Sequence, residues 1–142
     1  MTLFPDTKPT LHLTNWSSKK LHGPGRKFTI MANPRAWEKG DGSVPSCTPT
    51  KPAVLLVKLG QMPWMEFHEH VLRRVLGQNN KPGELWAIVS GDMVPVEDGD
   101  TLCCACSRED AAAGHCHRVF VAEALAQVGW RIVLDGEEVR SR

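Results

Sequence analysis

The sequence predicts a single α/β domain in which helices flank a mainly parallel β-sheet. Short apolar runs typical of buried strands alternate with longer segments that carry an apolar stripe at helical spacing. The last three of these segments, over residues 101–134, follow in the order strand, helix, strand, which is typical of a βαβ unit. A length of 142 residues is enough for one domain with its own core.

The first part of the chain is expected to hold two strands and a long loop. We expect residues 1–8 to be a loose leader before a domain that spans 9–142. Apolar and polar residues alternate over 11–16, the period of a half-buried strand, and residues 28–31 repeat a strand pattern. Glycines and prolines interrupt residues 33–52, which predicts a long loop of the kind that is often functional.

The remaining elements follow from apolar runs and stop signals. Residues 53–59 are short, apolar and rich in Val and Leu, which favours a buried strand. Residues 62–76 carry an approximate apolar stripe that ends at Gly77, which predicts a helix. We also expect strands at 85–89, 101–106 and 130–134 and a helix at 116–128.

Charge limits the partners of the chain. The net charge of +1 argues against a protein that binds a polyanion by bulk charge alone. Residues 1–40 nevertheless hold seven basic and two acidic residues, so the basic residues of 19–40 are a candidate surface for an anion, a nucleic acid or a protein.

The lack of a visible targeting segment and the pattern of cysteines both predict a cytoplasmic protein. No signal peptide or apolar stretch near the roughly 20 residues of a membrane span is visible, so we expect a cytoplasmic protein without membrane contact. Five cysteines, four of them between Cys103 and Cys116, do not form the even framework of a secreted disulfide scaffold. Reduced thiols are therefore expected.

The densest chemistry lies between Thr101 and Arg118. Ligands of open α/β sheets bind beyond the carboxyl ends of the strands, where the next helix presents free backbone N–H groups. An anion at this position would meet amide donors, guanidinium groups and an imidazole. The residues expected at this edge are Cys106, Ser107, Arg108, Cys116, His117 and Arg118.

Three interpretations of the cysteines remain open. The first is a zinc site, although Cys103 and Cys104 should point to opposite faces of a strand. The second is a nucleophile, since Cys116 at a helix N-terminus beside His117 could form a thiolate. A protein tyrosine phosphatase loop would need an arginine where Ala122 stands. The third is a structural role, which we favour for Cys103 and Cys104 as core residues.

Residues 101–135 resemble a known family. A strand that ends in Leu102-Cys103, a loop, and a Cys116-His117-Arg118 helix start are similar to the C-terminal signature of the domain of unknown function four-eight-eight family. Asn15-Trp16-Ser17-Ser18 is similar to the early strand and serine turn of that family. The resemblance implies a Rossmann-like α/β fold with a pocket around the Cys-His-Arg segment, and it implies no established reaction.

These observations lead to one leading hypothesis, in which the chain binds a phosphorylated, nucleotide-like ligand at the Cys-His-Arg edge. If the chain also acts on this ligand, as a hydrolase or transferase, Cys116 and His117 are the candidate catalytic residues. The leading hypothesis requires no metal or other cofactor. The candidate ligand-binding residues are Asn15, Ser17, Ser18, Arg26, Arg35, Ser107 and Arg118.

Two alternatives come from other classes of protein. One is a non-enzymatic module that binds or sequesters a protein or nucleic-acid partner through the basic residues of 19–40. The other is a zinc-stabilised domain that uses the Cys/His cluster.

Overall fold

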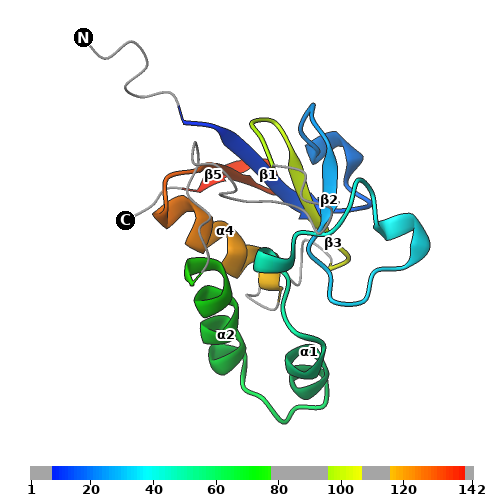
Figure 1. The fold of residues 1–142 in the computed structure, drawn as a ribbon, viewed down its shortest axis with the longest axis vertical. Coiled ribbons are helices and arrows are strands. Elements are labelled where there is room, and N and C mark those ends of the chain that lie inside the picture. The colour runs from blue at the N-terminus through cyan, green and yellow to red at the C-terminus, as the bar shows by residue number, and fades with distance from the viewer. Residues whose placement is uncertain (1–7, 78–95, 107–115, 140–142) are drawn as a thin grey trace.

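Five β-strands of the described residues form one sheet above a stack of helices (Figure 1). The computed structural model describes residues 8–77, 96–106 and 116–139. The sheet order is β2-β3-β1-β4-β5; only β5 runs antiparallel to its neighbour among these described strands. The expected α/β class with a mainly parallel sheet is confirmed. The strands are β1 (Thr10–Asn15), β2 (Lys27–Thr29), β3 (Thr101–Cys104), β4 (Arg131–Leu134) and β5 (Glu137–Val139).

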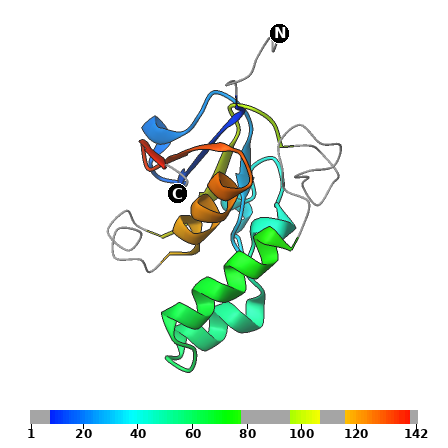
Figure 2. The ribbon, with the colours of Figure 1, turned by 90° about the vertical axis from the view of Figure 1, so that its left-hand side faces the viewer.

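Helix α4 lies against the sheet, and α2 packs on the side of α4 that faces away from the sheet (Figure 1). Helix α1 lies beside α2 (Figure 2). The ring of Phe120 in α4 stacks on His68 of α2 at a centroid distance of 4.2 Å and meets Phe67 edge-on at 6.4 Å. The helices are α1 (Lys51–Lys58), α2 (Trp64–Leu76) and α4 (His117–Gln127), with 3-10 turns η1 (Lys19–Leu21), η2 (Ala36–Glu38) and η3 (Pro45–Cys47).

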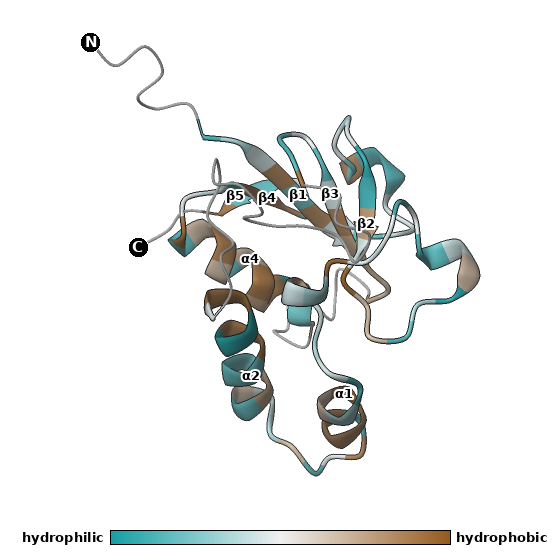
Figure 3. Cartoon of the chain, in the orientation of Figure 1, coloured by the Kyte–Doolittle hydropathy of each residue, from teal (hydrophilic) through white to brown (hydrophobic). Residues whose placement is uncertain are grey.

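The core lies between the sheet and α4. Hydrophobic segments run along the middle of the sheet and along α4, whereas α2 carries hydrophilic turns as well (Figure 3). All four residues of β3, which lies between β2 and β1, are buried. Eight of the eleven residues of α4 are buried, so this helix is enclosed on more than one face. In the described part of the chain, no helix combines the length and apolar character needed to cross a bilayer.

Most expected elements are confirmed with small shifts at their ends. The strands expected at 11–16, 28–31, 101–106 and 130–134 correspond to β1, β2, β3 and β4, and the helices expected at 62–76 and 116–128 correspond to α2 and α4. The strand expected at 85–89 and the candidate residue Ser107 lie outside the described residues.

The prediction of a strand over residues 53–59 is wrong, because this run lies mostly within helix α1. The Thr50 side chain accepts a hydrogen bond from the backbone N–H of Ala53, and Pro52 stands in the first turn, where a missing N–H costs nothing. Leu55 is 57% exposed, so the apolar run did not indicate burial. The cap and the proline are helix-start signals that the apolar run obscured.

The long loop expected at 33–52 is largely irregular, as predicted. It contains η2 and η3, and its last two residues begin α1. The loop folds back along β2 through isolated bridges between Phe28 and Gly40 and between Thr29 and Ser43. Glu38 is buried and its Oε1 accepts a hydrogen bond of 3.0 Å from the backbone N–H of Arg35. These contacts hold Arg35 beside the end of β2.

The turn between β4 and β5 was not predicted. Asp135 and Gly136 have φ values of 49° and 87°, and two positive values in a two-residue hairpin turn are typical of type I′. The Thr14 hydroxyl donates a hydrogen bond of 2.8 Å to Oδ1 of Asp135. The turn thereby places a carboxylate beside β1.

The contact between His70 and Thr50 predicts a pH-dependent stability. The Nε2 atom of His70 accepts a hydrogen bond of 3.3 Å from the backbone N–H of Thr50. Burial, together with the nearby Arg74 and Arg73, lowers the pKa of His70 in the fold. His70 takes up a proton more readily in the unfolded chain than in the fold. The contribution of neutral His70 to the free energy of unfolding is therefore intact above about pH 6.5 and is lost as the pH falls below this value.

We expect the free energy of unfolding to fall less steeply between pH 7.5 and pH 5.5 (about one unit either side of the unfolded pKa) in His70→Gln than in the unaltered chain. Denaturant unfolding at both pH values checks this. Parallel pH profiles for the two proteins would show that His70 does not contribute.

Candidate functional site

The carboxyl ends of β1 and β3 and the first turn of α4 meet at one edge of the sheet (Figure 1). Asn15, the last residue of β1, pairs with Cys104, the last residue of β3. Helix α4 begins at His117, with Cys116 as its N-cap residue. The strand and helix ends expected to form the site therefore lie together.

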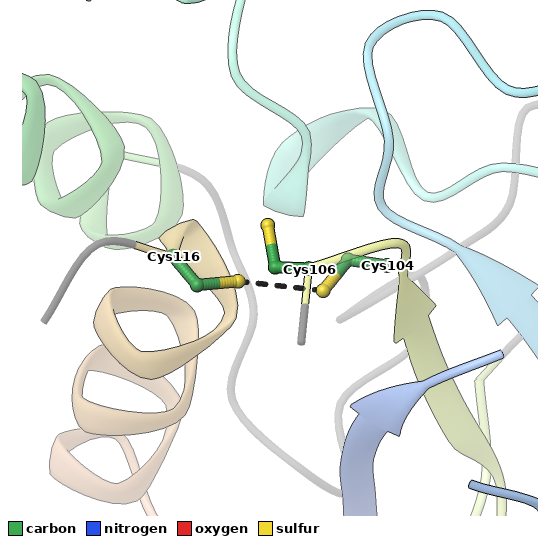
Figure 4. A group of neighbouring side chains, drawn as sticks. All are labelled: Cys104, Cys106 and Cys116. Atoms are coloured by element: carbon green, nitrogen blue, oxygen red, sulfur yellow. Dashed lines mark hydrogen bonds between the residues drawn. The ribbon is translucent and has the colours of Figure 1, made fainter. Parts of the chain in front are cut away.

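Three cysteine sulfurs gather at this edge (Figure 4). The Sγ atoms of Cys104, Cys106 and Cys116, here called the cysteine cluster, all lie within 4.8 Å of one another. The sulfurs of Cys104 and Cys116 are 3.4 Å apart and share a hydrogen bond. Both Cys103 and Cys104 are buried, as predicted, but only Cys104 belongs to the cluster. None of the five cysteines, all of which lie in the described residues, forms a disulfide in the structure.

Arg118 is fully buried behind the cluster. Its Nη1 donates to Sγ of Cys104 at 3.0 Å, to Sγ of Cys116 at 3.6 Å and to the carbonyl oxygen of Cys106 at 2.7 Å. Its Nη2 forms an ion pair of 3.0 Å with Oδ2 of Asp135. A buried cation requires such anionic partners, because desolvation of an isolated charge is very unfavourable. Arg118 thus faces the cysteine cluster and Asp135.

The three thiols of the cluster shift one another's pKa. Hydrogen bonds from Cys106 and Cys116 are the main cause that lowers the pKa of Cys104 well below its usual range, and the charge of Arg118 adds to the effect. The hydrogen bond to Cys104 raises the pKa of Cys106 to about 11. It also raises the pKa of Cys116. The shared hydrogen bonds thus lower the pKa of Cys104 and raise that of Cys116, the candidate nucleophile.

His117 connects α4 to the end of β2. Its Nε2 lies 2.7 Å from the carbonyl oxygen of Ile30 and donates to it, since a carbonyl only accepts. Burial lowers the pKa of His117, so the ring is neutral. His117 is 9% exposed, and it lines a cavity together with Cys106 and Cys116.

Two adjoining cavities open beside the cluster. The thiol cavity, of about 420 Å³, is walled by Cys106, Cys116 and His117 and by apolar side chains that include Val54, Val57 and Phe67. The cationic cavity, of about 450 Å³, is lined by Arg35 and Lys58 with Trp16, Ser17, Trp37 and Glu38. Met31, Asn33, Lys58 and Ala105 belong to both walls.

Asn15 and the two candidate serines differ in their surroundings. The amide of Asn15 is used inside the fold: Nδ2 donates to the carbonyl oxygen of Cys106 at 3.1 Å, and Oδ1 accepts from the backbone N–H of Ser18 at 2.8 Å. Ser17 is exposed and lines the cationic cavity. Asn15 therefore positions the strand end, and Ser17 is the candidate that reaches a cavity.

Arg26 lies at the opposite end of the sheet from the other candidates. It precedes β2, and its backbone carbonyl accepts from the N–H of Thr101, the first residue of β3. Its Nη2 pairs with Oδ2 of Asp100 at 3.2 Å, and the guanidinium lies 5.2 Å from the ring centroid of Phe28. Of the candidate ligand-binding residues, Arg26 thus lies at the amino end of β3 and Arg118 beyond its carboxyl end.

The basic residues of 19–40 lie in different local surroundings. Arg35 is exposed at the cationic cavity. Lys27 donates from Nζ to the carbonyl oxygens of Gly23 and Gly25, near the start of β2. Lys19 and Lys20 are exposed in η1. The alternative of a partner surface on the basic residues of 19–40 stays a prediction.

Sequence reasoning missed three contributors to the site. Lys58 was assigned to a strand, so its place in the cavity walls was not anticipated. Asp135 follows β4 in a turn whose Asp-Gly pair is a recognisable hairpin signal. The signal for the cysteine cluster is the Cys104-x-Cys106 spacing together with Cys116 at a helix start. The adjacent pair Cys103-Cys104 is not such a signal, since Cys103 lies outside the cluster.

No family model, curated protein or solved structure matches the chain. The resemblance of residues 101–135 to the domain of unknown function four-eight-eight family stays a prediction.

Proposed function

We propose that the chain binds a small phosphorylated ligand with a planar ring, of the nucleotide type, at the carboxyl edge of the sheet. The observation that carries this proposal is the cationic cavity, in which Arg35 and Lys58 line the same wall as Trp16 and Trp37, beside the thiol cavity. Each cavity has the volume of an ordinary small-molecule site. One offers apolar surface, and the other offers cationic and aromatic side chains.

The phosphate is assigned to the cationic cavity. Arg35 and Lys58 come from different segments and line the same hollow, where both can donate charge-assisted hydrogen bonds. Ser17 adds a hydroxyl in the same wall. Arg118, the original candidate for this role, is 0% exposed and is engaged by Asp135 and the cysteine cluster.

The planar ring is assigned to the tryptophans. Trp37 is 62% exposed, which is unusual for so large an apolar side chain, and it lines the cationic cavity with Trp16. A base that stacks on an indole gains roughly 1–3 kcal/mol in binding free energy. This arrangement would favour a nucleotide over inorganic phosphate.

The proposal is for binding rather than hydrolysis or group transfer. Cys106 and Cys116 line the thiol cavity, but the pKa of each is raised, that of Cys106 to about 11. A protonated thiol is a poor nucleophile. His117 donates to the Ile30 carbonyl through Nε2, which leaves that nitrogen unable to accept a proton.

Adenosine 5′-monophosphate is the probe for this proposal. We expect calorimetry to detect its binding, with weaker binding of adenosine or of inorganic phosphate alone. Arg35→Gln/Lys58→Gln should weaken nucleotide binding at least about 10-fold, because hydrogen bonds to charged groups contribute about 1.5–3 kcal/mol each.

The matched control is Lys19→Gln/Lys20→Gln, which removes the same charge from two exposed lysines of η1. It should leave the dissociation constant of the nucleotide nearly unchanged. Equal weakening by the two double variants would contradict a defined site, as would a lack of nucleotide binding.

A further inference from the structure

We propose that the cysteine cluster is a binding site for one thiophilic divalent cation of the zinc class. This inference rests on the sulfurs and Arg118, and it does not depend on nucleotide binding. Among the described residues, Cys104, Cys106 and Cys116 form the group whose ligand atoms lie close enough together for a shared ion.

The spacing of the sulfurs fits a single ion. Two thiolates bound to one zinc at about 2.3 Å, at the tetrahedral angle, are about 3.8 Å apart. In the structure, the Cys104 and Cys116 sulfurs are 3.4 Å apart and all three sulfurs lie within 4.8 Å. Small side-chain rotations are therefore enough to surround an ion. A cluster of several metal ions would need a wider separation of the sulfurs.

The ligand chemistry selects a soft cation. Three sulfur ligands favour zinc and related ions over magnesium or calcium, which prefer oxygen. The cysteines lose their thiol protons to solvent when they bind the ion. Three thiolates and a dication carry a net charge of −1, and the buried guanidinium of Arg118, which also pairs with Asp135, lies against this charge.

Arg118 also has the position of an outer-shell partner. Its Nη1 donates to the sulfurs of Cys104 and Cys116, at 3.0 and 3.6 Å. Such hydrogen bonds orient ligands and typically change metal affinity 10–100-fold. The Asp135 carboxylate holds the other side of the guanidinium, which fixes its direction.

A tetrahedral ion would keep one position for a further ligand. Cys106 and Cys116 line the thiol cavity, so this position would be reached from that cavity by water or a small ligand. Three protein ligands with one exchangeable position are typical of reactive rather than purely structural zinc sites.

The test uses the full-length reduced protein, stripped of metal and then titrated with Zn²⁺ or Co²⁺. We expect one equivalent to bind, with the near-ultraviolet charge-transfer absorption of a cobalt–thiolate complex. X-ray absorption of the zinc-loaded, unaltered protein should show about three sulfur neighbours near 2.3 Å. Oxygen or nitrogen neighbours alone would overturn the proposal, and this measurement requires no variant to fold.

Variants separate the cluster from the other cysteines. Cys106→Ser, at the least buried of the three positions, should lower zinc affinity at least about 100-fold, since even outer-shell changes cost 10–100-fold. Cys103→Ser and Cys47→Ser, which change cysteines outside the cluster, should bind zinc as the unaltered chain does. Unchanged affinity in Cys106→Ser, with circular dichroism showing a folded protein, would overturn the assignment.

Discussion

Replacing Arg118 by methionine is expected to lower the free energy of unfolding by about 3–5 kcal/mol. The methionine side chain has a similar reach but no charge, so it leaves the Asp135 carboxylate and the Cys104 sulfur without their shared donor. The Arg118 side chain is 0% exposed and that of Asp135 is 17% exposed, so water cannot replace the lost partner fully. Urea denaturation of both proteins measures the difference.

A double-variant cycle separates the ion pair from simple packing. Asp135→Asn should be destabilising alone, and Arg118→Met/Asp135→Asn should cost less than the sum of the two single changes. The free energy of unfolding of Arg118→Lys should lie between those of the unaltered chain and Arg118→Met. Lysine keeps the charge but lacks the planar guanidinium that donates to several acceptors at once. A loss within about 0.5 kcal/mol for Arg118→Met, the size of an ordinary surface change, would contradict the role of Arg118 as a buried counter-ion.

Asp100 is expected to be the second most sensitive polar residue, with a loss of about 3 kcal/mol in Asp100→Ala. Its buried carboxylate accepts from the backbone N–H of Arg26 at 2.8 Å and from that of Glu97 at 2.8 Å. It also pairs with the Arg26 guanidinium at 3.2 Å. Removal of the carboxylate leaves two backbone donors without this acceptor, at about 1–3 kcal/mol each.

The control for Asp100 is Arg26→Gln, which removes the guanidinium and keeps both backbone donors. We expect a loss below about 1 kcal/mol, because the Arg26 side chain is 35% exposed and its ion pair is partly solvated. Thermal and denaturant unfolding of the two variants should therefore differ clearly. Equal losses would show that the ion pair, rather than the backbone hydrogen bonds, carries the effect.

Periodicity predicted the strands and helices that are buried on a regular face. Alternation over 11–16 and the apolar run at 101–106 identified β1 and β3, and the stripe at 62–76 identified α2. The apolar run at 53–59 led to the wrong prediction of a buried strand, because apolar composition alone does not show whether a segment is buried. Leu55 and Leu59 are more than half exposed. There, the Thr50 cap and Pro52 carried the better signal.

The sequence predicted where the site lies, but it did not predict which residues line a cavity and which are buried behind it. Parallel strands place their carboxyl ends at one edge, so the position of Cys116 and His117 followed from the βαβ order. Arg26 directly precedes β2, so the parallel direction of this strand, rather than its place in the sheet order, puts Arg26 at the amino end of the sheet. The burial of Arg118 depends on Asp135 and the cysteine cluster, which meet only in the folded chain.

The most direct measurement is a backbone amide chemical-shift map of the full chain during titration with adenosine 5′-monophosphate. We expect the largest changes at residues of the cavity walls, which are Ser17, Asn33, Arg35, Lys58 and Ala105. Amides at the opposite end of the sheet, such as those of Arg26 and Asp100, should stay unchanged. Shifts concentrated at Arg26 and Asp100, with none at the carboxyl edge, would contradict a ligand site at the cysteine cluster edge.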